Sequence, residues 1–329
     1  MAKKKKKHSH GVRKELPEKF VERMTALFGL SRFREIEKTF VGRPTTFRIN
    51  RLKASSTEVI PFLSSHGFKV QKIAWYPDAY VLLNKSKREL TECHIYAEGK
   101  IYIQSLASMV PPLVLEPKSG DRVLDLTAAP GSKTSQITAL MGRHGELVAN
   151  DKNKIRFFKL KHNMELLGVT DESPEWQFTL RMEHGAQLSR EYTDYFDKIL
   201  LDAPCSAEAR FDTTDPKSFG YWSERKIKEM AYTQRILLRA AWHMLRPGGV
   251  LVYSTCTFAP EENEVQVQKF LDRTPDASVE PIVLDIPRAP IVHAFKALTF
   301  RDDVRTHALR ILPTPQIEGF FVVKIKKLS

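Results

Sequence analysis

Apolar positions beyond residue 105 fall in short runs separated by amphipathic stretches. Leu106–Leu115 is largely apolar and predicts a helix, which leads into a turn at Pro117–Gly120. The later runs are short enough to be buried strands, and the stretches between them have helical spacing. The five runs are Arg122–Leu126, Glu146–Asn150, Trp176–Leu180, Lys198–Leu201 and Gly249–Ser254. This alternation is typical of a parallel sheet covered by helices on both faces, so residues 106–329 are predicted to form a doubly wound, Rossmann-like α/β domain.

The first third of the chain has a different pattern. Leu16–Phe40 places apolar residues at helical spacing, and a second helix is expected near Thr57–His66. Thr46–Asn50 and Ile73–Trp75 have the composition of short strands around that second helix. Together these elements predict a small mixed α/β domain over residues 15–105.

Positive charge is concentrated in the same third. The chain has a formal net charge of +13, and residues 1–105 carry 22 Lys and Arg against 10 Asp and Glu, which leaves +1 for the other 224 residues. Because neutralised phosphates release counterions, such an excess predicts contact with a polyanion such as RNA. The cations that are interleaved with apolar residues are expected on a folded RNA-binding face. They are Arg32, Arg34, Arg43, Arg48, Arg51 and Lys53.

Residues 1–14 contain a lysine run and almost nothing to bury, so they are expected to be a disordered basic tail. The run Lys3–Lys7 either contributes to RNA binding or only keeps the chain soluble. No stretch approaches the roughly 20 apolar residues that a membrane span needs, and no apolar segment follows the lysines to form a signal peptide. We therefore expect a cytoplasmic monomer with no membrane partner.

Three cysteines, Cys93, Cys205 and Cys256, are too few for a disulfide framework. The sequence has no Cys-x-x-Cys and no histidine pair that would offer a metal site. Free cysteine usually behaves as a small buried hydrophobe, so each cysteine is either core filler or a nucleophile.

A turn rich in small residues follows the first strand of the predicted sheet. Small side chains let the backbone approach a ligand, and the helix N-terminus behind the turn offers free N–H groups to an anion. The turn lacks the spacing of a phosphate loop and of the three-glycine dinucleotide fingerprint, so a nucleoside triphosphate or NAD matches poorly. A tight turn without a ligand is the alternative. The turn consists of Thr127, Ala128, Ala129, Pro130, Gly131, Ser132, Lys133 and Thr134.

Asp151 follows the second strand, where a carboxylate can accept hydrogen bonds from both hydroxyls of a ribose. Its plain structural role is the N-cap of the predicted helix Lys152–Leu167, because Asp caps helices well, and both roles can coexist. An acid at this place, combined with a turn that does not fit phosphate, suggests S-adenosylmethionine. Its methionine carboxylate would meet the turn and its ribose would meet Asp151.

Two of the cysteines follow the fourth and fifth strands. Cys205 ends the fragment Leu201–Cys205, and Cys256 lies in Tyr253–Thr257. Neighbouring strands lie about 4.8 Å apart, so the two thiols are predicted to lie within about 10 Å of each other at one edge of the sheet.

Paired thiols at this edge favour one kind of chemistry. Carbon 5 of cytosine attacks a methyl sulfonium only after a nucleophile has added to carbon 6, and a thiolate is the natural attacker. An acid near N3 must stabilise the adduct, and Asp202, three residues before Cys205, is placed to do so if it carries or shares a proton. A second cysteine can assist release of the product. Spacing alone does not say which cysteine does which.

Several fragments of the chain resemble the Sun/Nop-type (Fmu) family of RNA cytosine-5 methyltransferases, nearest its bacterial ribosomal-RNA arm. The resemblance extends over nearly the whole chain and includes Trp222. The fragments are Arg48–Lys53, Gln104–Ser108, Ala128–Thr134, Asp202–Ser206, Ser254–Thr257, Glu261–Glu264, Thr233–Arg235 and Gly319–Val322.

The resemblance implies roles for the site residues. Cys256 would form the covalent bond to the base and Cys205 would help to free the product. Lys133 and Asp202 would face the target base. Residues 127–133, Asp151 and Asp202 would line the S-adenosylmethionine site.

The sequence departs from the family pattern at three places. Thr127 stands where Cys or Ala is frequent. Ser206–Arg210 replaces a turn that usually contains glycine, so the choice of substrate stays open. The acid expected after the third strand to meet the adenine is missing, and either Glu183 or His184 occupies that neighbourhood.

The sequence therefore predicts a two-domain enzyme in which a basic N-terminal domain binds RNA and a class I methyltransferase domain methylates a cytosine, with rRNA favoured over tRNA as the substrate. Two rival functions stay open. One is a DNA cytosine-5 methyltransferase that uses Cys205 as its nucleophile. The other is a ribosome-assembly factor that binds RNA without turnover.

Overall fold

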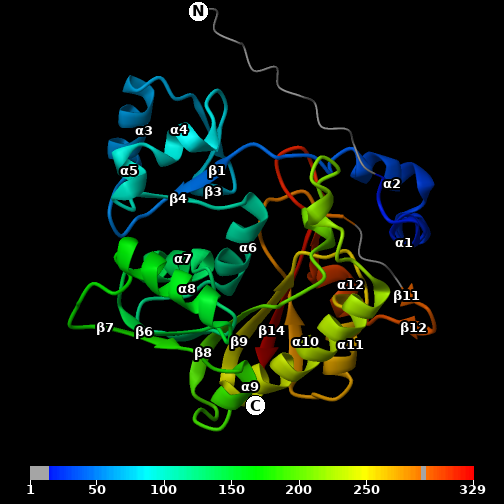
Figure 1. Ribbon diagram of the computed structural model, residues 1–329. Helices are drawn as coiled ribbons and strands as arrows, with labels where there is room; N and C mark the ends of the chain where they lie inside the picture. The colour runs from blue at the N-terminus through cyan, green and yellow to red at the C-terminus, as the bar shows by residue number, and fades with distance from the viewer. Residues whose placement is uncertain (1–14, 290–293) are drawn as a thin grey trace, which may run out of the picture.

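The computed structural model describes residues 15–289 and 294–329, which contain a large sheet, a small sheet and a two-stranded pair of β11 (Ala294–Phe295) and β12 (Leu298–Thr299) (Figure 1). The expected disorder of residues 1–14 lies outside the described residues. The strands of the large sheet are β5 (Arg122–Asp125), β6 (Gly145–Asn150), β7 (Trp176–Arg181), β8 (Phe196–Asp202), β9 (Leu245–Thr255), β10 (Ala277–Glu280), β13 (Leu309–Ile311) and β14 (Phe320–Lys327).

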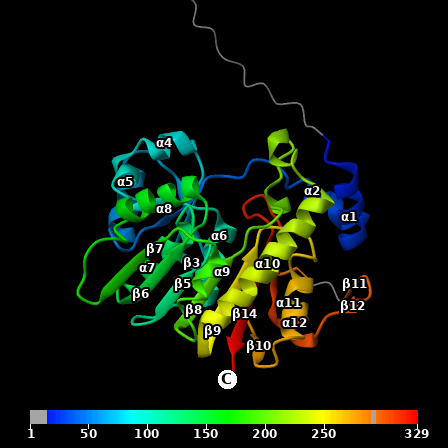
Figure 2. The same ribbon diagram turned by 60° about the horizontal axis from the view of Figure 1, so that its bottom comes forward.

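The large sheet has the strand order β10-β14-β9-β8-β5-β6-β7, with β13 paired to β14. Strands β7, β6, β5, β8 and β9 are parallel, and each corresponds to one of the five runs predicted from the sequence, although β5 ends at Asp125, one residue before its run does. The antiparallel strand β14, red beside the yellow β9 in Figure 2, inserts between β9 and β10. Strand order reverses between β5 and β8, so the carboxyl ends of these strands form the expected ligand-binding edge.

Helices cover both faces of the large sheet, because alternate strand residues are apolar on opposite sides. Val123 and Leu147 pack with residues of α6 and α7, whereas Leu124 and Val148 pack with residues of α10. This confirms the doubly wound prediction. The helices after β4 are α6 (Leu106–Leu115), α7 (Ser132–Met141), α8 (Lys154–Leu166), α9 (Gly185–Leu188), α10 (Glu224–Met244), α11 (Glu264–Leu271) and α12 (Asp302–His307).

The small sheet has the antiparallel order β2-β3-β1-β4 and carries three short helices. Thr46–Asn50 was correctly predicted as a strand. Ile73–Trp75 was wrong in part: β2 ends at Ile73, and Ala74 and Trp75 form the tight turn into β3. The elements are β1 (Thr46–Ile49), α3 (Ser56–Ser65), β2 (Val70–Ile73), β3 (Tyr76–Leu82), α4 (Lys87–Thr91), α5 (His94–Ala97) and β4 (Ile101–Ile103).

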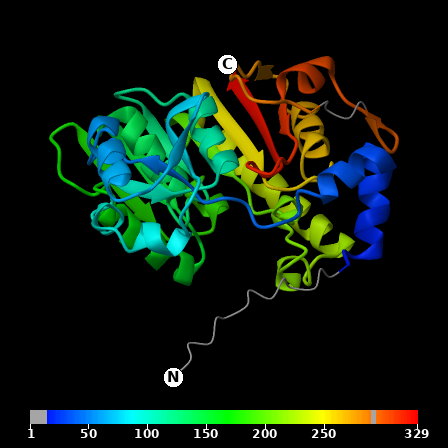
Figure 3. The same ribbon diagram turned by 90° about the horizontal axis from the view of Figure 1, so that it is seen from above.

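The first two helices, α1 (Glu18–Phe28) and α2 (Leu30–Glu37), lie apart from the small sheet, as Figure 3 shows. They divide the predicted helical run at Gly29, whose φ of +78° is a conformation that favours glycine. Their buried side chains pack in one aromatic cluster with Phe211, Phe219 and Phe258. The N-terminal segment therefore supports the loops that follow β8 and β9.

Arg48 was predicted on an RNA-binding surface, and that prediction is wrong. Its side chain is 0% exposed, and its Nε donates to Gln104 Oε1 at 2.9 Å. Its Nη2 donates to Ser132 O at 3.2 Å and to Ser135 Oγ at 2.5 Å. Arg48 thus joins the small sheet to the first turn of α7. The sequence pattern does not distinguish a buried arginine of this kind from an arginine on the surface.

Among the described residues, no helix has the length and apolar character needed to cross a membrane.

Candidate active site

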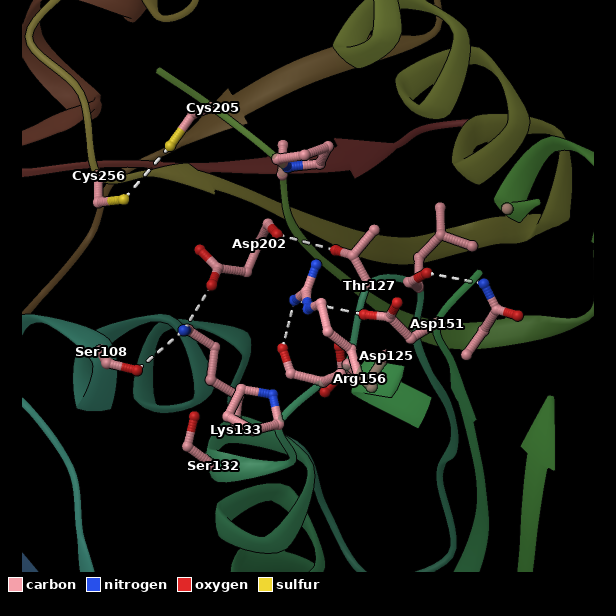
Figure 4. A pocket seen from close by; sticks show the side chains of 18 of the residues that line it. Ser108, Asp125, Thr127, Ser132, Lys133, Asp151, Arg156, Asp202, Cys205 and Cys256 are labelled. Carbon is pink, nitrogen blue, oxygen red and sulfur yellow. Dashed lines mark hydrogen bonds and ion pairs between the residues drawn. The ribbon is translucent and has the colours of Figure 1, made fainter. Parts of the chain in front are cut away.

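A cavity of about 570 Å³ opens at the carboxyl ends of β5, β6, β8 and β9 (Figure 4). Every site residue predicted from the sequence lines it except Gly131, which lies in the chain between the lining residues Pro130 and Ser132. The predicted residues that line it are Thr127, Ala128, Ala129, Pro130, Ser132, Lys133, Asp151, Asp202, Cys205 and Cys256.

The turn after β5 lies tightly against α8. Gly131 has a φ of +102°, and a Cβ there would come within 2.4 Å of Met164 Cε and 2.9 Å of Leu160 Cδ1. Glycine is therefore required for both the backbone conformation and the close approach. No side chain caps the N-terminus of α7, so the N–H groups of its first turn are available to an anion in the cavity.

Asp151 is 4% exposed and lies in the cavity wall after β6. Its Oδ1 accepts from Asn153 N at 3.0 Å, and its Oδ2 lies 3.3 Å from Arg156 Nη2. Arg156 also donates to Ala129 O at 2.5 Å and so joins Asp151 to the turn. The N-cap of α8 is Asn153, which accepts from Arg156 N, and Asp151 does not have the capping role that was its alternative.

A buried acid lies at the base of the same half of the cavity. Asp125 Oδ2 accepts from Thr134 Oγ1 at 2.7 Å, and Oδ1 has no hydrogen-bond partner among the described residues. Burial raises the pKa of Asp125 to about 7. An unpaired, buried oxygen in a ligand-sized cavity indicates that a donor from outside the chain belongs there.

The two candidates for contact with an adenine, Glu183 and His184, both line the cavity. The Glu183 carboxylate is paired with Arg181, with Oε1 2.5 Å from Nη2. His184 Nδ1 accepts from Ala186 N at 3.3 Å and caps α9.

Lys133 and Asp202 form an ion pair across the middle of the cavity, with Nζ 2.5 Å from Oδ2. The Lys133 side chain is 8% exposed, and its Nζ also donates to Ser108 Oγ at 2.9 Å. Asp202 Oδ1 accepts from Ser254 Oγ at 2.8 Å. In Figure 4 the Asp202 carboxylate lies between the two thiols and the Lys133 ammonium.

The thiols of Cys205 and Cys256 lie 3.3 Å apart, which confirms that the fold brings them together. A hydrogen bond from the Cys205 thiol lowers the pKa of Cys256, and the charge of Arg210 acts in the same direction, although burial opposes both. The same hydrogen bond raises the pKa of Cys205, because that thiol must keep its proton to donate. Cys93 packs in the core of the small sheet, far along the chain from this pair.

The loop after Cys205 forms the outer wall of the cavity. Ala207 has a φ of +58°, in the region that favours glycine, and Ala209 N donates to Cys256 O at 3.2 Å. Arg210 is exposed to the cavity. Ser206–Arg210 lacks the usual glycine, but its backbone keeps a conformation that favours glycine, and Ala207 adopts that conformation.

A buried polar cluster holds the two cysteine loops together. Glu262 Oε2 accepts from Ser206 N at 3.0 Å and from Gln234 Nε2 at 2.8 Å, and Gln234 Nε2 also donates to Pro204 O at 2.9 Å. Ser206 Oγ lies 2.7 Å from Thr257 Oγ1. Burial raises the pKa of Glu262 to about 8.

Sequence reasoning missed several residues of this site. Ser108 and Glu262 stood in recognised fragments without an assigned role. Arg156 gave no signal, because an arginine in the first turn of a helix is usually on the surface. The polar neighbours of Glu262, which are Glu261, Asn263 and Glu264, gave no sign that it is buried.

Two family models match the chain. One describes the 16S rRNA methyltransferase RsmB/F and matches residues 112–326. The other describes the N-terminal domain of 16S rRNA methyltransferase RsmF and matches residues 16–106.

Proteins with assigned names match along most of the chain. A tRNA (cytosine(49)-C(5))-methyltransferase of Pyrococcus abyssi is 33% identical, over 95% of this chain and 97% of that protein. A ribosomal RNA small subunit methyltransferase F of Pectobacterium carotovorum is 34% identical, over 86% of this chain and 56% of that protein. A protein of the same name from Vibrio parahaemolyticus is 34% identical, over 95% of this chain and 63% of that protein. The chain thus spans somewhat more than half the length of these ribosomal relatives.

Two solved structures have a similar fold along the whole chain. A methyltransferase homolog protein from Pyrococcus horikoshii has a TM-score of 0.81 and 31% identity and covers 95% of each chain. The structure of NSun6 from Pyrococcus horikoshii with SFG has a TM-score of 0.79 and 25% identity, over 95% of this chain and 98% of that one. The domain match over residues 112–326 and the full-length relative at 33% identity show that this chain belongs to the RsmB/F family of methyltransferases.

Proposed function

We propose that this chain transfers the methyl group of S-adenosylmethionine to carbon 5 of a cytosine in RNA, through a covalent bond between Cys256 and carbon 6. The observation that carries the proposal is the pair of thiols 3.3 Å apart beside the ion pair of Lys133 and Asp202. Residues 15–105 would serve RNA binding and residues 106–329 would perform the transfer.

The cofactor half of the cavity fits S-adenosylmethionine. The uncapped N-terminus of α7 suits a carboxylate, and the unpaired Oδ1 of Asp125 suits an ammonium donor. Asp151 presents a buried carboxylate to ribose hydroxyls. When bound, the cofactor supplies an electrophilic methyl group to the base.

The base half of the cavity supplies the nucleophile and the proton. The Cys256 thiolate adds to carbon 6, which moves electron density to carbon 5 and to N3. A proton moves to N3 through Asp202 from the Lys133 ammonium, to which Asp202 is hydrogen-bonded, and so neutralises that charge.

Release of the product reverses the first addition. After carbon 5 has gained the methyl group, its proton passes to water and the electrons of that C–H bond restore the ring double bond. The bond between carbon 6 and Cys256 breaks with its electron pair returning to the sulfur, and the N3 proton returns to the pair of Asp202 and Lys133. Cys205 is adjacent to Cys256 and would assist this release. The resemblance to the family assigns the attack to Cys256 and the release to Cys205, against the DNA-type assignment, and the two thiols lie close enough to exchange a proton.

We favour ribosomal RNA over transfer RNA as the substrate, because the family models are those of 16S rRNA methyltransferases and their N-terminal domain. The tRNA name of the Pyrococcus abyssi relative supports the alternative. Both substrates use the same chemistry at the cavity.

The test is methyl transfer from labelled S-adenosylmethionine to small-subunit rRNA, tRNA and a cytosine-containing DNA, followed by bisulfite sequencing of the labelled nucleic acid. We expect label at a single cytosine of the rRNA. Label in tRNA alone would move the substrate assignment, and label in DNA or in none of the three would contradict the proposal.

A further inference from the structure

Helix α8 has apolar side chains on its buried face and also on the face that is exposed to solvent. Leu160 and Met164 pack inward beneath the turn after β5. At 3.6 residues per turn, Ile155, Phe158 and His162 lie together on the opposite side of the helix. Ile155 is 84% exposed and Phe158 is 54% exposed. The helix therefore presents an apolar and aromatic ridge to solvent.

Positive charge flanks this ridge. By the same helical spacing, Lys154 and Lys161 lie on one side of it and Lys159 on the other. Among the described residues none of these three lysines has an ion-pair partner, and the one acid of α8 is Glu165, four residues after Lys161 near the end of the helix. Residues 106–329 have almost no net charge as a whole, so the positive charge on this helix is a local concentration.

The N-terminal end of α8 adjoins the cavity. Lys152, just before the helix, and Arg156, in its first turn, line the cavity. At the other end of the helix, Leu167 O accepts from Asn50 Nδ2 at 2.9 Å, which places that end next to the small sheet. A strand of nucleic acid whose target base enters the cavity would pass over α8 on its way to the N-terminal domain.

We propose that the outward face of α8 binds the single-stranded RNA that flanks the target cytosine, with a base stacked on Phe158 and phosphates paired with Lys154, Lys159 and Lys161. An exposed ring between cations is the arrangement that binds single strands without reading sequence. A second copy of this chain fits poorly, because two such faces would oppose like charges. The inference rests on the proposed methyl transfer to RNA, and it specifies where the RNA that flanks the target cytosine lies on the protein.

The ring is tested by Phe158→Leu and Phe158→Tyr, measured by fluorescence anisotropy with a short single-stranded RNA that contains cytosines. Stacking predicts that Leu, which keeps the apolar bulk, weakens binding by about 5-fold or more, and that Tyr binds like the natural residue. Equal affinity of the Leu variant and the natural protein would overturn the stacking contact.

The cations are tested by the double variant Lys159→Gln with Lys161→Gln. We expect the log–log dependence of RNA affinity on salt to become shallower by about 1 to 1.5, because each lost phosphate contact on a single strand removes about 0.7. The matched control is Lys118→Gln with Lys326→Gln, which removes two lysines near the amino ends of β5 and β9, at the edge opposite the cavity. An equal change in slope for both double variants would overturn the proposal, because it would reflect net charge alone.

A third measurement separates this inference from the proposed function. Methyl transfer measured with saturating RNA should keep its rate in the α8 variants while the RNA concentration for half-maximal rate rises. If the natural protein methylates RNA and the α8 variants bind it unchanged, the inference fails and the proposed function stands. If the α8 variants lose affinity for an acidic protein surface and not for RNA, the partner assigned here is wrong.

Discussion

The two halves of the cavity are built in different ways. The cofactor half comes from two consecutive strand ends and the turn between β5 and α7, so that sequence neighbours are also neighbours in space. The base half combines Lys133, Asp202, Cys205 and Cys256, which come from three separate segments, and it depends on the buried cluster around Glu262. Binding of the cofactor should therefore tolerate changes that disable the chemistry, and the predictions below test this separation.

The largest effect is expected from Cys256→Ala. Removing the attacking thiol should lower the rate of methyl transfer by at least about 1,000-fold, because no other group of the cavity replaces a covalent nucleophile. Affinity for S-adenosylmethionine, measured by calorimetry, should stay nearly unchanged. Loss of cofactor affinity in this variant would show that the two halves of the cavity do not act independently.

Glu262→Ala should destabilise the base half. It leaves Ser206 N–H and the Gln234 amide without their buried acceptor, which costs about 2–4 kcal/mol in the free energy of unfolding. Urea unfolding measures this, and the control is Glu261→Ala, which removes a partly exposed ion pair with Arg23 worth about 1 kcal/mol or less. Equal losses for the two neighbours would contradict the role of the buried cluster.

The pH dependence of stability tests the same carboxyl. The pKa of Glu262 is raised from 4.5 to about 8, so the folded state keeps a proton that the unfolded state releases. Its contribution to stability is therefore complete below about pH 4.5 and is lost as pH rises toward 8. Glu262→Gln, which cannot ionise, should gain stability relative to the natural protein between pH 5 and 8. A constant difference in urea unfolding across that range would contradict the raised pKa.

Asp151→Ala should act on the cofactor half alone. Loss of charge-assisted hydrogen bonds to a ribose should weaken cofactor binding by about 1–3 kcal/mol. Asn153→Ala removes the true cap of α8 and serves as the control, because it should lower stability and leave cofactor affinity nearly unchanged. If the two variants affect calorimetric affinity equally, Asp151 acts only on the helix.

The smallest effect is expected from Ala207→Gly in the loop of the base half. A non-glycine residue at a φ of +58° costs about 1 kcal/mol, and glycine relieves this strain. Glycine also raises the entropy of the unfolded chain, which offsets part of the gain. The free energy of unfolding should therefore rise by about 0–1 kcal/mol. Ala231→Gly, inside α10, should lower stability by about 1 kcal/mol. A clear loss of stability for Ala207→Gly would show that the packing of the Ala207 methyl group stabilises the fold by more than the backbone strain costs.

The same contrast explains what the sequence could predict. The parallel strands and the residues at their ends were predictable, because apolar runs and strand-end motifs are local patterns. The antiparallel β14 was not, since its place between β9 and β10 depends on pairing between distant segments. Arg48 and Glu262 show the limit most clearly: a charged residue is expected at the surface, and only the packed structure shows that both are fully buried.

The central claim is that Cys256 attacks the base and Cys205 releases it. The most direct test is Cys205→Ala, mixed with S-adenosylmethionine and the RNA that the natural protein methylates, and examined by denaturing electrophoresis. We expect a covalent protein–RNA complex that carries the methyl group, accumulates with time, and is absent when Cys256 is also replaced. A complex trapped by Cys256→Ala instead, with none from Cys205→Ala, would contradict the account and exchange the roles of the two thiols.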